Sequence, residues 1–309
     1  MHINKMKNKL TGSQVIVPMV SPFTADYSID EAAVVRISEM FVKAGVSVFV
    51  LGTTGEGDSM STEQRDTLLK LTVKEVNGGS KVYAGLTGNS LSASVEDAKK
   101  YADWGADYLV AKLPSYYPMN ESQMFRYLEQ LASSVKLPLF IYNIPATTHH
   151  SIPLSVIDQL SHHPNIAGLK DSERNLDRLE DSIRLWSERE DFDYLIGWAP
   201  MSVYGLIKGA NGIVPSTGNL CPEWYVQMIE CVCAGDEENA RKLQEKTDHI
   251  SAMYQNGKSL SQSIPALKVM MKMKRICSEE VLPPMFPMTS MEEKIFISEV
   301  KNEWTKLNF

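Results

Sequence analysis

The chain has 309 residues, of which 43% are hydrophobic and 22% charged, and its formal net charge is −7 at pH 7. This composition is typical of a globular protein with a large core and differs from that of a disordered chain. The acidic balance speaks against a nucleic-acid surface, and no apolar run is long enough to cross a bilayer. We therefore expect small-molecule or protein partners, with no nucleic acid and no membrane.

The N-terminal residues and the cysteines indicate the compartment. The first ten residues, MHINKMKNKL, are positively charged, but no apolar segment follows them, so we expect no signal peptide. The cysteines form neither a disulfide framework nor a C-x-x-C pair; they are Cys221, Cys231, Cys233 and Cys277. A reduced, cytoplasmic protein is the natural interpretation.

Short apolar runs alternate with longer helical patterns from residue 14 to about residue 234. The strand candidates are 14–20, 47–53, 81–87, 107–113, 138–144, 166–170, 194–199 and 212–217. Most are apolar almost without interruption, which is typical of parallel strands buried on both faces. Between them, 61–76 repeats leucines and valines at helical spacing, and 92–105 is a helix that closes on Gly105.

Eight strand–helix repeats predict an α/β protein of the (β/α)₈ TIM-barrel class. A doubly wound open sheet would need a glycine-rich phosphate loop after an early strand, and no G-x-G-x-x-G follows one here. After residue 235 the pattern changes to helices without strands, at 236–254, 264–276 and 290–304, with a proline-rich connector at 282–288. We predict a barrel over 1–235, which carries the active site, and a small C-terminal helical appendage over 236–309.

Polar residues gather at the C-terminal ends of the strands, where such barrels carry their chemistry. Thr53 and Thr54 follow the second strand, Tyr142 lies in the fifth, and Lys170 ends the sixth. Each has a simple structural interpretation: Lys170 is the first solvated residue after Leu169, and Tyr142 fills the core. Their convergence on one mouth of one barrel favours a functional site.

Three motifs occur in order on these strands: GTTGE at 52–56, YNIP at 142–145 and GLKDS at 168–172. With PSYYP (114–118), GANGIVPSTGN (209–219) and LPPMFPM, they resemble the dihydrodipicolinate synthase and N-acetylneuraminate lyase family over nearly the whole chain. These are class I, Schiff-base aldolases that handle pyruvate. The resemblance implies a covalent lysine imine, no metal or organic cofactor, and a homo-oligomer (dimer or tetramer).

The resemblance also implies residue roles. Lys170 would attack the ketone of pyruvate, which requires a neutral amine; an apolar barrel interior would lower its pKa from the ordinary ~10.4. Tyr142 would be the general acid and base, with Thr53 as the relay hydroxyl. Tyr117 would complete the relay across a dimer interface, with Tyr116 as the adjacent alternative.

The same resemblance suggests how the substrate is bound. Thr53 and Thr54 would hold the pyruvate carboxylate, and Val214 would line the pyruvate end of the site. Thr147 stands where the synthases carry a carboxylate-binding arginine, and a threonine offers no bidentate fork. Trp198 stands where the sialic acid lyases carry acidic residues, and it could form an apolar wall or pack as core.

These departures predict an aldolase or lyase of another specificity, acting on a 2-keto-3-deoxy sugar acid or a 4-hydroxy-2-oxoglutarate-like substrate. A dihydrodipicolinate synthase or N-acetylneuraminate lyase proper, and a dehydratase on the same imine, are the alternatives within this chemistry. Outside it stand a non-catalytic barrel that binds 2-oxo acids and a phosphate-binding isomerase, for which STGN at 216–219 is only a faint anion site. The adjacent histidine pairs, 149–150 and 162–163, have no metal-site spacing, so we expect no metal.

Overall fold

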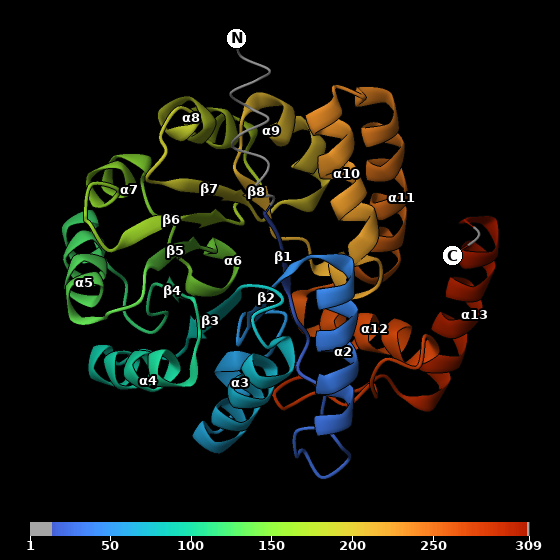
Figure 1. Cartoon of the computed structure of the whole chain (residues 1–309). Coiled ribbons are helices and arrows are strands. Elements are labelled where there is room, and N and C mark those ends of the chain that lie inside the picture. Colours follow the sequence, from blue (N-terminus) through green and yellow to red (C-terminus); the bar gives the residue numbers. More distant parts are fainter. Residues whose placement is uncertain (1–13, 308) are drawn as a thin grey trace.

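Eight parallel strands close into a barrel at the centre of the molecule, which is a computed structural model that describes residues 14–307 and 309 (Figure 1). Each strand pairs with the next, and β8 returns to β1 through Gln14 opposite Gly212. The predicted TIM barrel is confirmed. The strands are β1 Gln14–Pro18, β2 Ser47–Val50, β3 Val82–Leu86, β4 Tyr108–Lys112, β5 Leu139–Asn143, β6 Ile166–Asp171, β7 Asp193–Ile196 and β8 Gly212–Ile213.

Helices surround the barrel and continue beyond it. Those that connect or follow the strands are α2 Glu31–Ala44, α3 Thr62–Val76, α4 Leu91–Trp104, α5 Glu121–Ser134, α6 Pro145–Thr148, α7 Leu154–Leu160, α8 Leu176–Trp186, α9 Ser202–Lys208 and α10 Pro222–Ala234. The 3₁₀ turns are η1 Gly57–Ser59, η2 Ala199–Met201 and η3 Ser216–Asn219. The C-terminal helices are α11 Glu237–Gln255, α12 Leu260–Met273 and α13 Ser290–Leu307.

Apart from β6, which runs to Asp171, the strands end earlier than the apolar runs predict. The run 47–53 leaves the sheet after Val50 because Leu51 takes a left-handed conformation with φ 62°. The run 212–217 leaves it after Ile213, shortly before Pro215, which has no N–H for a ladder. The C-terminal parts of these runs therefore form the loops at the barrel mouth.

Capping residues set the helix ends that the sequence predicts well. Ser61 and Gln64 form a reciprocal capping box at the start of α3, and Gly105 ends α4 in the left-handed conformation, as predicted. Helix α12 begins at residue 260 instead of 264, because Ser259 and Gln262 form a second capping box and Pro265 lies inside the helix.

The core has two layers. Inside the barrel lie nine buried residues: Ile16, Phe49, Tyr83, Val110, Phe140, Tyr142, Ile144, Leu195 and Val214. The rings of Tyr83 and Tyr108 stack at 4.6 Å, and Phe140 meets both edge-on at 5.5 Å. A second, larger layer fills the space between strands and helices. Aromatic rings thus fill the lower and middle interior, and polar side chains occupy the mouth.

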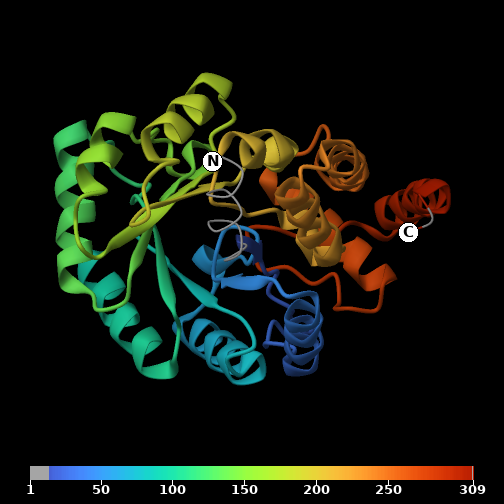
Figure 2. The same cartoon turned by 45° about the horizontal axis from the view of Figure 1, so that its top comes forward.

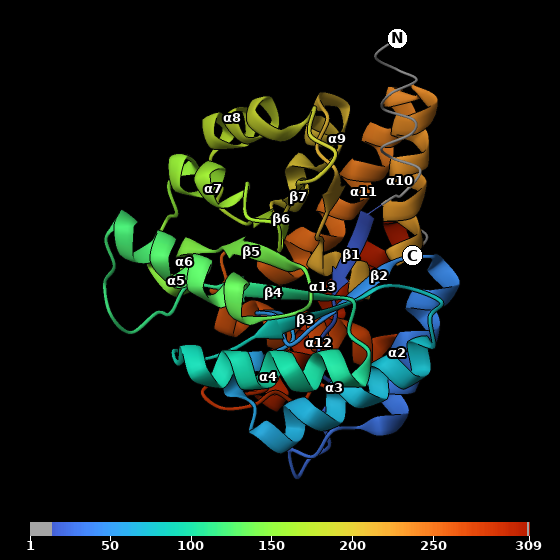
Figure 3. The ribbon, with the colours of Figure 1, turned by 60° about the vertical axis from the view of Figure 1, so that its left-hand side comes forward.

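The C-terminal helices lie on one side of the barrel. Figures 1 and 3 both show α11 beside α10, and Figure 2 shows α13 at the outer edge of the molecule. Gly235 ends α10 with φ 77°, at the predicted boundary between barrel and appendage, and the division into two parts there stays a prediction. None of the helices within the described residues is long and apolar enough to span a membrane.

Candidate active site

Lys170 is buried inside the barrel. Strand β6 continues through it to Asp171, and the register of β5 and β6 sets Lys170 beside Tyr142. Both residues are only 5% exposed. The lysine Nζ lies 3.9 Å from the ring centroid of Tyr142 and 4.6 Å from that of Phe49. The interpretation of Lys170 as the first solvated residue after the strand is therefore wrong.

The surroundings of Lys170 favour its neutral amine. Burial lowers the pKa of Lys170, and the nearby Tyr142 hydroxyl opposes this shift only in part. No carboxylate in the described chain contributes to its charge environment. A neutral amine carries a lone pair, which is what a nucleophile at a carbonyl carbon needs.

The contact with Lys170 also shifts the pKa of Tyr142, and the direction of that shift suits a residue that carries protons. Burial by itself raises its pKa, but the charge of Lys170 and hydrogen bonds with the hydroxyls of Thr53 and Ser172 outweigh that effect, so the net pKa lies below its ordinary value. The Thr53 hydroxyl lies 3.5 Å from the phenol oxygen, at the outer limit of a hydrogen bond. The phenol can accept and donate a proton beside the lysine.

The turn that carries Thr53 and Thr54 is tightly packed against the backbone beneath it. A Cβ on Gly57 would lie 2.2 Å from the Leu51 carbonyl oxygen, and one on Gly55 would lie 2.8 Å from that of Met19. The sequence GTTGEG therefore needs glycine at both places, and this packing fixes the two threonines at the mouth.

Glu56, the last residue of the GTTGE motif, makes a buried ion pair that the sequence did not indicate. Its Oε1 lies 2.5 Å from Nζ of Lys268 on α12, and both side chains are 0% exposed. Its Oε2 accepts a hydrogen bond of 2.7 Å from the backbone N–H of Leu282. The threonine turn is thus tied to the C-terminal helices.

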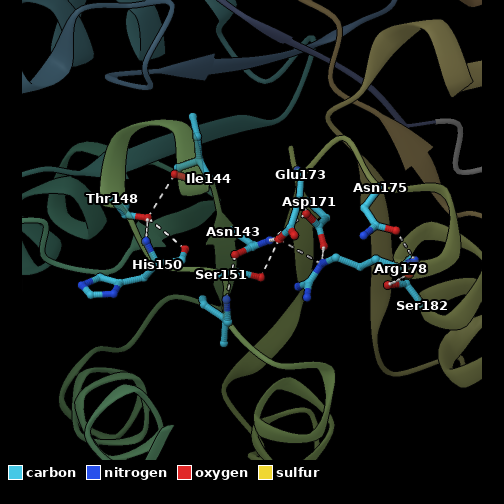
Figure 4. Close-up of polar contacts among 11 residues, drawn as sticks. Asn143, Ile144, Thr148, His150, Ser151, Asp171, Glu173, Asn175, Arg178 and Ser182 are labelled. Carbon is cyan, nitrogen blue, oxygen red and sulfur yellow. Dashed lines mark hydrogen bonds and ion pairs between the residues drawn. The ribbon is translucent and has the colours of Figure 1, made fainter. Parts of the chain in front are cut away.

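A second polar network fixes the ends of β5 and β6 on the outer side of the barrel (Figure 4). The Asn143 amide donates to Asp171 at 2.9 Å and to Glu173 at 3.0 Å, and Arg178 donates to Asp171 at 2.6 Å. Burial raises the pKa of Asp171, and the Arg178 charge opposes that shift. Because Asn143 and Asp171 directly follow Tyr142 and Lys170, the network holds the two reactive side chains in place.

A cavity of about 430 Å³ opens above Lys170 and Tyr142 at the barrel mouth. Four predicted binding residues lie on its wall: Thr53, Thr54, Val214 and Trp198. The far wall comes from the end of α11, the loop after it and α12, through Tyr254, Gln255, Lys258, Leu260, Ser263, Ile264 and Leu267. The appendage therefore completes the site.

Two predicted site residues lie away from this wall. Thr147 is on α6, where its hydroxyl turns back to the Ile144 carbonyl at 3.4 Å, and its neighbour Ala146 faces the cavity instead. Tyr117 is 72% exposed, and its ring meets that of Tyr116 edge-on at 4.8 Å. The structure does not bring either of them to Lys170 within one copy of the chain.

The cavity also contains residues to which the sequence assigned no role. Ser172 stands two residues after Lys170, and that spacing on a strand end was an available signal. Arg174 lies in the loop after β6, so its place at a strand end was likewise an available signal. Gln255 and Lys258 carried no signal, because a helical appendage offers no register that would place its residues over the mouth.

The polar side chains of the site do not form a metal centre. Within residues 14–307 and 309, no group of three or more His, Cys, Asp or Glu side chains is arranged to hold a metal ion. His150, next to the YNIP motif, uses Nε2 for a 3.1 Å contact with the Tyr117 carbonyl. What the site offers is a buried amine, a phenol and hydroxyl groups.

Comparisons with known proteins agree with this arrangement. The model of the dihydrodipicolinate synthetase family matches residues 11–303. An uncharacterised DapA-like lyase of Thermococcus onnurineus is 32% identical over 295 residues, which are 94% of this chain and 98% of the relative. The dihydrodipicolinate synthase of Bacteroides thetaiotaomicron superposes with a TM-score of 0.87 at 30% identity and covers 93% of this chain and 97% of its own.

A third relative is YagE of Escherichia coli, named a putative 2-dehydro-3-deoxy-D-gluconate aldolase, which is 28% identical over 281 residues, 89% of this chain and 91% of YagE. Its crystal structure in complex with pyruvate superposes with a TM-score of 0.87 at 26% identity, over 94% of this chain and 98% of that one. The chain therefore belongs to the dihydrodipicolinate synthetase family and is a lyase of the Schiff-base aldolase class.

Proposed function

We propose that Lys170 forms a Schiff base with pyruvate or another 2-oxo acid and that the enzyme cleaves or forms a carbon–carbon bond next to the imine. The substrate is a 2-keto-3-deoxy sugar acid or a 4-hydroxy-2-oxoglutarate-like acid. The observation that supports this most directly is the buried Lys170 amine, set against the Tyr142 ring with no carboxylate partner in the described chain. The complex of YagE with pyruvate adds support from a relative.

In the proposed reaction the Lys170 nitrogen attacks the ketone carbon, and one of its two N–H protons passes to the ketone oxygen. The Tyr142 phenol gives the second proton, so that the oxygen leaves as water and Tyr142 becomes a phenolate. The Tyr142 phenolate then takes the proton of the C4 hydroxyl, the C3–C4 bond breaks, and the C4 fragment leaves as an aldehyde. The electrons of the broken bond move into the iminium to give an enamine, and the Tyr142 phenol holds a proton for C3. Protonation of the enamine at C3 and addition of water release pyruvate. The iminium is the electron sink, so the proposal includes no metal or organic cofactor.

The carboxylate of the 2-oxo acid is assigned to Thr53 and Thr54. Both line the cavity on a turn of small residues, where hydroxyl and backbone N–H groups can surround an anion. Val214 closes the pyruvate end, and Trp198 forms part of the wall further out. The cavity is larger than a three-carbon acid requires, which leaves room for the second part of the substrate.

Borohydride trapping tests this proposal. The enzyme is incubated with pyruvate, reduced, digested and mapped by mass spectrometry, and we expect the reduced adduct on the peptide that contains Lys170. Lys99→Gln is the control, because it removes an exposed lysine of α4 and leaves both buried lysines in place. An adduct on another lysine, or none on the folded wild-type protein, contradicts the proposal.

In this proposal, Tyr117 of a second copy of the chain completes the proton relay at the active site. It lies on the exposed loop between β4 and α5, next to the exposed Tyr116, and so is available to a partner. We expect a dimer or tetramer by light scattering, and a loss of activity in Tyr117→Phe at unchanged assembly. A fully active monomer excludes this role.

A further inference from the structure

The mouth of the cavity carries two cations that the proposed reaction does not use. Arg174 follows β6, four residues beyond the proposed nucleophile, and Lys258 lies in the connection between α11 and α12. Both line the cavity together with Lys170. The pyruvate carboxylate is already assigned to the threonine turn, so these charges have no assigned partner.

The two side chains keep most of their donors available. Arg174 Nη2 donates to Gln255 Oε1 at 3.4 Å; Lys258 Nζ donates to the Met253 carbonyl at 3.4 Å and lies 5.5 Å from the centroid of the Phe296 ring. Both are long hydrogen bonds to uncharged acceptors, and neither cation pairs with a carboxylate of the described residues. A guanidinium and an ammonium left in this way at a cavity mouth are suited to an anion.

The carboxylates near this mouth do not cancel the two charges. Glu173 lines the cavity, but its Oε2 accepts hydrogen bonds from Ser151 at 2.6 Å and Asn143 at 3.0 Å, and it lies 3.5 Å from Arg178. Asp248 lies in an adjoining surface hollow that shares Arg174 and Lys258 with the cavity. The Asp248 carboxylate accepts a 2.8 Å hydrogen bond from the Gln244 amide, and burial raises the pKa of Asp248. Glu292 and Glu299 line a further hollow, which shares only Lys258 with the cavity. Within the cavity itself, Arg174 and Lys258 outnumber the one carboxylate, Glu173.

A cluster of hydroxyl and amide groups holds Gln255, the hydrogen-bond partner of Arg174. The buried Tyr254 hydroxyl lies 2.7 Å from the Ser216 hydroxyl and accepts a 2.9 Å hydrogen bond from the Gln255 amide. Gln255 in turn presents its oxygen to Arg174. The hydroxyls of Ser216 and Tyr254 thus hold Gln255 at the cavity, and its long contact with Arg174 leaves the guanidinium donors available to a ligand.

We propose that Arg174 and Lys258 bind a second anionic group, a carboxylate or a phosphate, at the end of the substrate distant from the imine. The inference rests on the proposed Schiff-base function and narrows its substrates to 2-oxo acids with a charged far end. Pyruvate binds near Lys170, the acceptor aldehyde occupies the outer cavity, and the two cations select aldehydes that carry the anion.

Aldol condensation with matched aldehydes tests this inference. The rate of pyruvate consumption is measured with succinic semialdehyde against butanal, and with glyceraldehyde 3-phosphate against glyceraldehyde. We expect wild-type kcat/KM to be at least about 10-fold higher for the anionic member of one pair, because charge-assisted hydrogen bonds discriminate by this order. The pair that shows the preference tells a carboxylate site from a phosphate site.

Variants of the two cations test whether these residues produce the preference for anionic aldehydes. In Arg174→Gln and Lys258→Gln we expect the ratio of anionic to neutral kcat/KM to fall about 10-fold, mainly through KM for the aldehyde. In Lys99→Gln, which removes an exposed cation of α4, we expect the ratio to stay the same. Equal wild-type rates for both members of each pair, or a ratio unchanged in both variants, overturn the inference.

Trapping with pyruvate alone separates the two proposals. If wild type forms the Lys170 adduct but shows no preference for anionic aldehydes, only this inference fails. If wild type forms no adduct at Lys170, the proposed function fails and the distal-anion site fails with it.

Discussion

Two lysines are buried in the described part of the chain, and their surroundings are opposite. Lys268 donates to the Ser21 and Glu280 carbonyls at 2.6 Å each, and its Nζ lies 2.5 Å from Oε1 of Glu56, so two carbonyls and a carboxylate surround the ammonium. Lys170 faces two aromatic rings and a phenol, without a carboxylate. Burial lowers the pKa of both lysines, but only at Lys268 does a buried carboxylate stabilise the ammonium.

The difference separates a structural lysine from a reactive one. Two carbonyls and a carboxylate stabilise an ammonium, which has no lone pair for chemistry, whereas a buried amine without a counter-charge loses its proton more readily. Burial alone therefore does not identify a nucleophile. What identifies Lys170 is burial together with the missing counter-charge.

The largest expected effect is that of Lys170→Met on catalysis. Loss of the nucleophile should reduce kcat/KM for retro-aldol cleavage by about 10⁴-fold or more and abolish the pyruvate adduct. The fold should not weaken, because methionine fills a similar volume and has no ammonium to bury. Activity assays, intact-mass analysis after reduction and thermal melting measure the three quantities. Activity close to wild type contradicts the assignment of Lys170.

The same substitution at the other lysine should act on stability. Lys268→Met leaves the Glu56 carboxylate buried without its partner, and removing one partner of a buried pair costs about 3–5 kcal/mol. In the double variant Glu56→Gln with Lys268→Met we expect most of this free energy to return. Chemical denaturation of the single and double variants gives the free energies of unfolding. Equal stabilities of Lys170→Met and Lys268→Met would break the comparison.

Tyr142→Phe should have an intermediate effect on activity. It keeps the ring beside Lys170 and removes the hydroxyl, so we expect kcat to fall by about 10²–10⁴-fold, the usual range for a general acid or base. Adduct formation with pyruvate should slow but persist, because the amine is still present. An unchanged kcat, measured with adduct formation under single-turnover conditions, would remove the phenol from the mechanism.

How much of the fold and of the site could be predicted from the sequence depends on the type of contact. The barrel and the pairing of Lys170 with Tyr142 follow from strand order and from residues at strand ends, because parallel strands bring their C-terminal ends to one rim. Lys268 could not be predicted as a buried partner of Glu56, since its helix shows apolar periodicity but no sign of which turn it meets. Lys258, in the connection between two appendage helices, was missed for the same reason, whereas Arg174 follows β6 and its place at a strand end was a signal that the sequence did offer. Contacts across distant segments depend on packing angles that local patterns do not encode.

The smallest expected effect is the contribution of Lys170 to the pH dependence of the free energy of unfolding. Its folded-state pKa is lowered, so between that pKa and the ordinary ~10.4 the unfolded chain binds more protons than the folded one. Stability from this group therefore rises with pH through that window. Because Lys170 also shifts the pKa of Tyr142, the comparison is made in the Tyr142→Phe background. Subtracting the pH profile of the double variant Lys170→Met with Tyr142→Phe from that of Tyr142→Phe removes the contribution of Lys268, which both proteins share. We expect Tyr142→Phe to gain stability relative to the double variant as pH rises toward 10, with a slope of at most about 1.4 kcal/mol per pH unit. A flat difference would mean that the Lys170 ammonium is as well stabilised as that of Lys268, and the distinction between the two lysines would then lose its electrostatic basis.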